Sequence, residues 1–560
     1  MVNPTPKQIE IRDAAALDLM VVAPAGCGKT EALALRIQGL LNRGDVLAPQ
    51  KILVTTFSNR ARDNIRERLN SYLPAAQMRD RVSVSNFHGL AARIFRAHAN
   101  VIGMDPGLII PEGDWIGDEL RRRNVPWNSR GPIQDTLRDV KLQPLNDPAV
   151  EAELVRRRAA MALSIEQERK AQGRLTYDDL PRVAELILAN DEVAELYRAH
   201  FGAVVVDEFQ DLTPQQLRIV NRIGFKRTTF AGDLAQGIYG FTGAKPSVVD
   251  SSVRAECATT VQFSESHRSS PAVLNVVNAL DPLTGGQPLT CAAPASWPSG
   301  GLAALVRHQH ASAEADWIVK VSQAILLRAP SHRIGVIART AGRRAFADAA
   351  FAASTIEPFR WDDGVVDTDT ARVVKAMLAS FDMVAFTVAS DKSAFLREAA
   401  NFESISDVDG RKNLADALTW VHDRLDEALL PADVRARVRT GDSDALISKP
   451  GVHLLTGHAG KGQQFDWVFV AGLEEDILPD FRDKSAEGIA EEARVLSVMV
   501  SRARHGVIMC YSDDVPPASG KSWMRNPSRF LTQISSAAPL DATGMVEWFN
   551  TANWPAIAQR

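Results

Sequence analysis

Residues 21–30 constrain the fold of this chain most, because an apolar run leads directly into a glycine-rich turn that ends in Gly-Lys-Thr. Residues 23–30 read Ala-Pro-Ala-Gly-Cys-Gly-Lys-Thr, and a helical pattern follows them. Small residues in such a turn let backbone N–H groups surround a phosphate, while a lysine reaches its outer oxygens and a hydroxyl binds Mg²⁺. The segment therefore predicts a phosphate-binding loop between a strand and a helix.

Each residue of this loop is a candidate for nucleotide binding. Ala23 stands where the usual pattern has its first glycine. We expect Lys29 to act in catalysis as well, Thr30 to bind the metal, and oxidation of the Cys27 thiol to change activity. The expected nucleotide-binding residues of the loop are Ala23, Ala25, Gly26, Cys27, Gly28, Lys29 and Thr30.

Length and composition are those of a multidomain globular protein. The chain has 560 residues, which at about 150 residues per domain predicts three to four domains. Its formal charge of −4 provides no overall attraction for polyanions, so a nucleic acid must be held by a local groove. The four cysteines show no C-x-x-C spacing, which argues against a zinc site, an iron–sulfur cluster or a disulfide framework. A soluble cytoplasmic protein is expected, since neither a signal-like start nor an apolar run of about 18 residues occurs.

Strand and helix patterns alternate in two parts of the chain. We expect doubly wound α/β units with parallel strands in both parts. Residues 101–200 have the pattern of an inserted helical domain, and residues 363–448 are helical again, with a stripe of leucines and a valine from Leu414 to Leu429 that is typical of core packing. The expected strands cover residues 52–55, 82–84, 203–206, 228–231, 302–306, 333–338, 452–456, 467–471 and 507–511.

Two carboxylates end one of the expected buried strands, where Val204-Val205-Val206 is followed by Asp207 and Glu208. There the chain leaves its pleat, so both side chains can face a bound triphosphate. Asp207 would hold Mg²⁺, and Glu208 would accept the proton of the attacking water. An Asp-Glu pair alone is equally typical of a solvated turn. The phosphate-binding loop upstream favours the catalytic interpretation.

With these motifs in order along the chain, the sequence resembles the UvrD/Rep/PcrA family of superfamily 1 DNA helicases, from Gln8 to about Leu531. The resemblance implies two RecA-like parallel-sheet ATPase domains, each with a helical insertion. It implies that Gln8 reads the adenine edge. Residues 56–61 and 86–89 resemble the two motifs that touch single-stranded DNA in the first domain, with Phe57, Asn59 and His88 as the implied contacts.

The resemblance also implies domain limits. The expected first ATPase domain comprises residues 1–100 and 201–267, with its insertion at 101–200; the second comprises 268–362 and 449–560, with a reduced insertion at 363–448.

Residues 232–244 resemble the motif that joins the γ-phosphate to the DNA track. Gln236 would sense the γ-phosphate or the lytic water. Tyr239 and Phe241 would offer ring faces to unstacked bases, an interaction of about 1–3 kcal/mol per base. Taken alone, such aromatic residues are more often part of a core. Thr242 stands where the family usually has arginine.

Two arginines resemble the family's arginine fingers. Ser266-His267-Arg268-Ser269 matches the motif at the entry to the second domain, with His267 replacing the tyrosine that stacks on adenine, and Val500-Ser501-Arg502-Ala503 matches the last motif. Arg268 and Arg502 would therefore stabilise charge on the transferred phosphoryl group when the cleft is shut.

Residues 456–465 resemble a motif that contacts both the strand and the nucleotide. Gln464 stands where a glutamate usually meets the ribose, and His458 and Lys461 would face the strand. Gly460 and Gln463 also depart from the family pattern.

The predicted function is an ATP-dependent helicase or translocase that moves 3′ to 5′ on single-stranded DNA, with ATP and Mg²⁺ as cofactors. Its partners would be single-stranded DNA and single/double-strand junctions, with no membrane. The reduced second insertion favours translocation over processive unwinding. The alternative is a DNA-stimulated regulatory ATPase subunit beside a nuclease partner, as in Gabija-type phage-defence systems. A third reading, a scaffold without turnover, is weakened by the presence of all the catalytic residues named above.

Overall fold

The computed structural model describes residues 4–57, 59–110, 114–361, 364–366, 368–404, 408–427, 429–440, 449–482, 484–516 and 524–560. The chain divides into two compact units. The sheet unit comprises Met1–Ile102, Ala184–Phe359 and Pro450–Arg560, and the helical unit comprises Gly103–Val183 and Arg360–Lys449. Each unit is described by itself below.

The first lobe of the sheet unit contains a parallel sheet with the strand order β3-β2-β4-β5-β1-β6. Its central strands are buried on both faces, which is why they are apolar throughout. The strands are β1 (Leu19–Val22), β2 (Lys51–Thr56), β3 (Val82–Asn86), β4 (Phe201–Asp207), β5 (Thr228–Gly232) and β6 (Thr259–Gln262).

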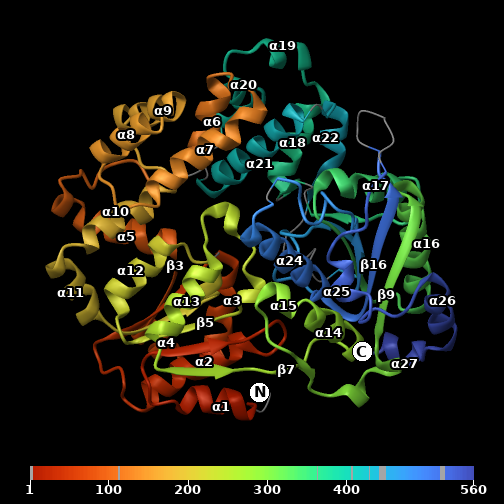
Figure 1. Ribbon diagram of the computed structural model, residues 1–560. Coiled ribbons are helices and arrows are strands. Elements are labelled where there is room, and N and C mark those ends of the chain that lie inside the picture. The colour runs from red at the N-terminus through yellow and green to blue at the C-terminus, as the bar shows by residue number, and fades with distance from the viewer. Residues whose placement is uncertain are drawn as a thin grey trace. The chain divides into compact units, whose positions relative to one another are not determined.

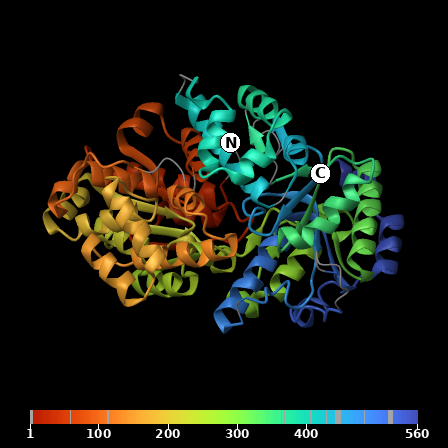
Figure 2. The same ribbon diagram turned by 90° about the horizontal axis from the view of Figure 1, so that it is seen from above.

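The second lobe contains a second sheet, with the order β11-β14-β10-β15-β16-β9. Figure 2 shows the two sheets in separate lobes, the first drawn in red to yellow and the second in green to blue. The strands are β9 (Leu302–His310), β10 (Arg333–Ala338), β11 (Phe359–Arg360), β14 (Gly451–Thr456), β15 (Phe465–Ala471) and β16 (Ala503–Asp514). Short pairs are formed by β7 (Glu265–Ser266) with β8 (Thr290–Cys291) in the sheet unit, and by β12 (Gly364–Val366) with β13 (Val438–Thr440) in the helical unit.

Helices cover both sheets of the sheet unit (Figure 1). In the first lobe they are α1 (Pro6–Asp13), α2 (Lys29–Asn42), α3 (Asn59–Asn70), α4 (Ala75–Arg81), α5 (Phe87–His98), α11 (Asp191–His200), α12 (Pro214–Gly224) and α13 (Pro246–Glu256). In the second lobe they are α14 (Pro271–Ala279), α15 (Asp281–Thr284), α16 (Ala311–Arg328), α17 (Ala341–Ala352), α24 (Ala486–Val500), α25 (Leu531–Ile534), α26 (Ala542–Thr551) and α27 (Trp554–Ala558).

Local sequence explains where several of these helices begin. Thr5 and Gln8 form a capping box at the start of α1, and Pro6 occupies the first helical position. The Asn86 side chain accepts a hydrogen bond from Gly89 N and caps α5. Each sheet and its helices then enclose an apolar core, which in the second lobe contains Trp467. The predicted fold class, two parallel-sheet α/β lobes, is confirmed.

The helical unit is built from the two inserted segments. Its helices are α6 (Trp115–Arg122), α7 (Trp127–Lys141), α8 (Asp147–Arg156), α9 (Ala160–Ala171), α18 (Thr368–Ala379), α19 (Met383–Val388), α20 (Lys392–Ala399), α21 (Val408–Asp426) and α22 (Pro431–Arg437). Ion pairs join the segments, with 3.1 Å between Arg121 Nη1 and Asp423 Oδ1. The predicted leucine stripe packs in the core, where Leu414, Leu418 and Leu425 are buried.

Three observations refine the expected organisation. Helix α10 (Asp179–Leu188) crosses from the helical unit into the sheet unit, and α11 belongs to the sheet unit because it packs on β4 and α12. Residues 281–301 contribute the short strand β8 and the buried Trp297 to the sheet unit. Among the helices of the described ranges, none is both long and apolar enough to cross a membrane.

Candidate nucleotide and strand-binding site

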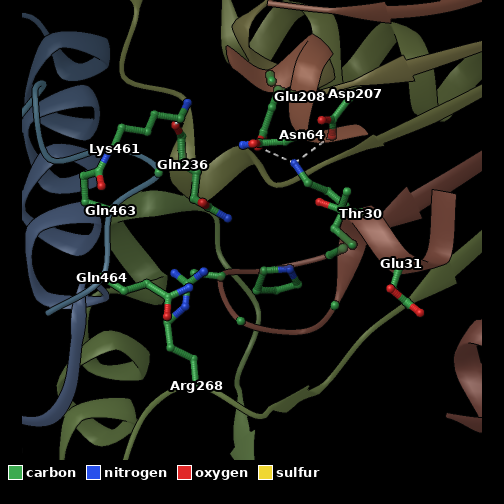
Figure 3. A pocket seen from close by; sticks show the side chains of 18 of the residues that line it. Thr30, Glu31, Asn64, Asp207, Glu208, Gln236, Arg268, Lys461, Gln463 and Gln464 are labelled. Carbon is green, nitrogen blue, oxygen red and sulfur yellow. Dashed lines mark hydrogen bonds and ion pairs between the residues drawn. The ribbon is translucent and has the colours of Figure 1, made fainter. Parts of the chain in front are cut away.

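A cavity of about 790 Å³ lies between the two lobes of the sheet unit. Its walls come from the loop after β1, the carboxyl end of β4, helix α3, and the segments around Arg268, Lys461 and Arg502 (Figure 3). Most of the sequence-predicted nucleotide residues line it. The lining includes Gln8, Ala23, Ala25, Gly26, Gly28, Lys29, Thr30, Asp207, Glu208, Gln236, His267, Arg268, Gln464 and Arg502.

The loop after β1 forms a cradle that only small residues permit. Gly26 and Gly28 have φ angles of +84° and +82°, and α2 begins at Lys29 directly after them. A Cβ atom on Gly26 would lie 2.5 Å from the Arg268 Cβ. Because the N-terminal end of α2 carries free N–H groups and a positive partial charge, this cradle fits a phosphate.

Lys29 lies between the two carboxylates at the end of β4. Its Nζ is 3.0 Å from Asp207 Oδ1 and also contacts Glu208 Oε1. Burial opposes the Lys29 charge, but Asp207 and Glu208 outweigh it and raise the lysine pKa. Burial likewise opposes ionisation of Glu208, yet Lys29 and Lys461 hold its pKa at about 2. Glu208 is therefore an anion at neutral pH, as a proton acceptor requires.

Backbone strain and a buried amide orient Glu208. The residue has φ of +56°, a conformation that non-glycine residues rarely adopt and that functional sites often contain. Gln210 Nε2 donates to Glu208 Oε2 at 2.6 Å, and Gln210 Oε1 accepts from Asp233 N at 3.0 Å. Sequence reasoning missed Gln210, although its position two residues after Glu208 was visible.

Gln236 reaches the cavity from a short 3₁₀ turn after β5. Its Nε2 donates to Asp233 Oδ2 at 2.9 Å, and the other oxygen of Asp233 accepts from Ala235 N. Burial raises the pKa of Asp233. The turn thus presents the Gln236 side chain beside Glu208 at the cavity wall (Figure 3).

Arg268 and Arg502 line the same cavity as Asp207. The Gln464 side-chain amide is oriented with its oxygen toward Arg268. This oxygen accepts a hydrogen bond from Arg268 Nη2 at 3.1 Å. Arg502 is 2% exposed, and its Nε donates to Val498 O at 2.9 Å. Burial lowers the pKa of Arg268 to about 10 and, with Arg268 itself nearby, that of Arg502 to about 9. Two cations so close together favour an anionic ligand between the lobes.

The segment around Arg268 connects the phosphate loop to the second lobe. His267 N donates to Gly26 O at 3.1 Å, while Ser270 N donates to Arg504 O at 2.8 Å. The His267 side chain is exposed and lines the cavity. Gln8 is buried, and its Nε2 donates to Gly28 O at 3.3 Å. The adenine contacts expected of Gln8 and His267 stay predictions.

Among the lining residues that lie outside the motifs recognised in the sequence are Glu31, Asn64 and Arg68. Arg68 Nε lies 3.1 Å from Glu31 Oε2. Asn64 and Arg68 are four residues apart on α3, which places them on one face of that helix. Their four-residue spacing on the helix that follows the 56–61 motif could have identified Asn64 and Arg68 from the sequence. Cys27, by contrast, is buried, and burial raises its pKa to about 12, so the structure argues against an oxidation-sensitive thiol.

Four predicted strand contacts form one continuous row of rings. Phe57 stacks on Tyr239 with 4.8 Å between centroids, Tyr239 contacts Phe241 at 5.8 Å, and Phe241 contacts His458 of the second lobe at 5.2 Å. Phe241 is 56% exposed. Burial lowers the pKa of His458 to about 4, so this ring is neutral at pH 7.

The other expected strand contacts lie elsewhere. His88 occupies the first turn of α5, and burial lowers its pKa. The Asn59 side chain falls outside the described residues. Lys461, which we expected to face the strand, contacts residues of the first lobe, and its role toward the strand stays a prediction. Its Nζ donates to Asp211 and, at 2.7 Å, to Gln236 O, and it lies 4.7 Å above the Tyr239 ring.

Fold and site together define a P-loop ATPase whose nucleotide cavity is completed by arginines of a second lobe. The sequence model of the UvrD/REP helicase N-terminal domain matches residues 5–254, and that of the UvrD-like helicase C-terminal domain matches residues 400–514. The chain belongs to the UvrD/Rep family of ATP-dependent DNA helicases, whose members hydrolyse ATP.

Named relatives match most of the chain. It is 27% identical over 587 residues to the ATP-dependent DNA helicase UvrD2 of Mycobacterium tuberculosis (strain ATCC 25618 / H37Rv), covering 93% of this chain and 80% of that protein. It is 22% identical over 626 residues to the ATP-dependent DNA helicase PcrA of Staphylococcus aureus (strain MRSA252), covering 92% of this chain and 84% of the relative.

Proposed function

We propose that this protein is a Mg²⁺-dependent ATPase that moves along single-stranded DNA in the 3′ to 5′ direction and separates duplex ahead of it. One observation carries the proposal: Lys29, Asp207 and Glu208 of the first lobe share a cavity with Arg268 and Arg502. The direction is supported only by the family resemblance.

Residues of the first lobe would bind the triphosphate and begin the chemistry. Lys29 and the N–H groups at the start of α2 bind the phosphate oxygens. The Gly26 cradle and the buried Asp207 fit a phosphate with its metal, and Thr30 and Asp207 would hold Mg²⁺, which supplies charge neutralisation when bound. Glu208, an anion held by Gln210, takes the proton of the attacking water, and Gln236 orients that water.

Residues of the second lobe would make hydrolysis depend on closure. Arg268 and Arg502 add positive charge beside the transferred phosphoryl group, where it stabilises the transition state. Because Arg502 belongs to the second lobe, its distance from the phosphates would depend on lobe closure, and the rate of hydrolysis would follow closure.

The row Phe57–Tyr239–Phe241–His458 would hold the strand. Ring faces stack on bases of any sequence, as a translocating protein requires. The row runs from the end of β2 to the second lobe, so relative motion of the lobes changes the grip on the strand. The Tyr239 ring also lies beside Lys461, which contacts the Gln236 backbone, and this links the row to the ATP site.

The test compares ATP turnover with and without single-stranded DNA, and displacement of duplexes with 3′ or 5′ tails. Turnover rises with DNA, and only the 3′-tailed duplex is separated. Glu208→Gln lowers kcat by about 10²–10⁴-fold, and Lys29→Ala abolishes turnover, while the surface change Arg254→Gln leaves it unchanged. Absence of DNA stimulation would overturn the proposal.

A regulatory ATPase beside a nuclease is the second candidate. The short second segment of the helical unit, Arg360–Lys449, favours it, because a small insertion offers less surface to duplex. DNA-stimulated turnover without displacement of either tailed duplex would support this candidate over the helicase.

A further inference from the structure

We propose that a groove along the open edge of the first sheet binds the phosphate backbone of single-stranded DNA beyond the aromatic row. The groove encloses about 430 Å³ and is lined by Arg66, Arg79 and Arg93, with Asn70 and Ser83 between them. The inference rests on the proposed function, because it extends the path of the same strand.

The floor of this groove is strand β3, which stands at the edge of the first sheet. Helices α3, α4 and α5 all pack against β3, and residues of these helices line the walls of the groove. Arg66 Nη2 donates to Val84 O at 3.0 Å on the open side of the strand. An edge strand presents backbone N–H groups as well as carbonyls, so the floor offers donors that an anionic chain can use.

The walls carry more positive than negative charge. Arg93 has no hydrogen-bond or ion-pair partner among the residues that the structure describes. Burial is the main cause of its lowered pKa, and the nearby charge of Arg66 lowers the pKa further. Arg66 is 47% exposed and lies 3.9 Å from Asp63, whose carboxylate is already held 2.8 Å from Arg62. Arg79 is 76% exposed and, within the described part of the chain, forms an ion pair with its neighbour Asp80 alone. Cations held close together without full compensation favour phosphate.

The groove continues from residues already placed on the strand path. Helix α3 begins at Asn59, and Arg66 lies about 10 Å further along it. Helix α5 begins at Phe87, and Arg93 lies about 8 Å beyond His88. Both helices therefore run from an expected strand contact to an arginine of the groove, which would hold the next phosphates.

The test uses a triple variant, Arg66→Gln, Arg79→Gln and Arg93→Gln, and oligothymidylates of increasing length. Affinity is measured by fluorescence anisotropy at several KCl concentrations. We expect the slope of log affinity against log salt to shrink by about 2 for long oligonucleotides, because three phosphate contacts are lost. A short oligonucleotide that reaches only the aromatic row should bind the variant and the unchanged protein equally.

A matched control removes the same charge elsewhere in the sheet unit, through Arg12→Gln, Arg198→Gln and Arg254→Gln. Arg254 is exposed and Arg12 and Arg198 are partly exposed, and the three pair with Asp250, Asp13 and Glu195. Thermal unfolding checks that both triple variants are folded. The proposed groove would be overturned by equal salt slopes for the groove and control variants. It would also be overturned if the groove variant lost the same affinity at every oligonucleotide length. An unchanged protein that neither binds DNA nor shows DNA-stimulated turnover would overturn the proposed function itself.

Discussion

Lys461 of the second lobe forms an ion pair with Asp211 of the first lobe, with 2.6 Å between Nζ and Oδ2 and side chains that are 9% and 2% exposed. Burial raises the pKa of Asp211 to about 6 despite this pair. Two buried charges on opposite lobes stabilise each other only while the lobes are closed, and a partner left alone in the interior is costly.

The Lys461–Asp211 pair is expected to favour the closed lobes during turnover. We predict that Lys461→Ala and Asp211→Asn each lower DNA-stimulated kcat by about tenfold, and that the double variant is no slower than the slower single variant, because both changes remove one interaction. Steady-state ATPase assays measure this cycle. The same set of variants made at the Arg529–Glu475 pair, which lies within the second lobe and whose arginine is exposed, serves as control and should leave kcat unchanged. Effects that multiply in the double variant would contradict the coupling.

Gly26 is expected to tolerate no side chain. An alanine there would combine a φ of +84° with a Cβ only 2.5 Å from the Arg268 Cβ, so the loop or Arg268 must shift. We predict that Gly26→Ala abolishes ATP turnover and weakens nucleotide binding at least tenfold, measured by titration of a fluorescent ATP analogue. Gly342→Ala is the control, since a Cβ there has its nearest neighbour at 4.0 Å. Normal turnover in Gly26→Ala would refute the cradle.

Cys27 is expected to resist thiol reagents. With its pKa raised to about 12 by burial, almost none of the thiol is ionised at pH 7, and only the thiolate reacts rapidly. Iodoacetamide should label the partly exposed Cys291 well before Cys27, as mass spectrometry of the digested protein would show. The reagent should leave ATP turnover of the unchanged protein as it is, just as in Cys27→Ser, which lacks this thiol. Fast labelling of Cys27 in the folded protein would restore the oxidation hypothesis.

His505 is expected to make the second lobe sensitive to acid. It is 2% exposed, and burial lowers its pKa to about 3, against about 6.5 for an unfolded histidine. The unfolded chain therefore binds a proton that the folded chain does not. The contribution of the neutral His505 to the free energy of unfolding is fully present above pH 6.5 and is lost as the pH falls toward 3.

Between pH 7 and pH 5 this loss amounts to about 2 kcal/mol of unfolding free energy. His505→Gln should remove that part of the pH dependence. Urea unfolding followed by tryptophan fluorescence reports it, because the Trp467 ring stacks on His505 at 5.8 Å. The exposed His200→Gln serves as comparison. An unchanged difference between the two pH values in His505→Gln would show that His505 is not responsible.

The sequence alone determined the parts of this protein that depend on local pattern. The phosphate loop, the Asp207–Glu208 strand end and all the expected strands rest on residues near one another in the chain, because phosphate binding and buried parallel strands each demand particular residue types at fixed spacing. The leucine stripe of α21 was predictable for the same reason, since helical periodicity marks a buried face.

Only the tertiary structure decided which distant side chains meet. Lys461 and Asp211 are 250 residues apart, and nothing in either local pattern indicates that the lysine faces a carboxylate rather than the strand. The contact of Arg68 with Glu31 and the arginines around the edge of β3 follow from how helices pack on the sheet. Long-range pairing depends on topology and packing, which adjacent residues in a sequence do not encode on their own.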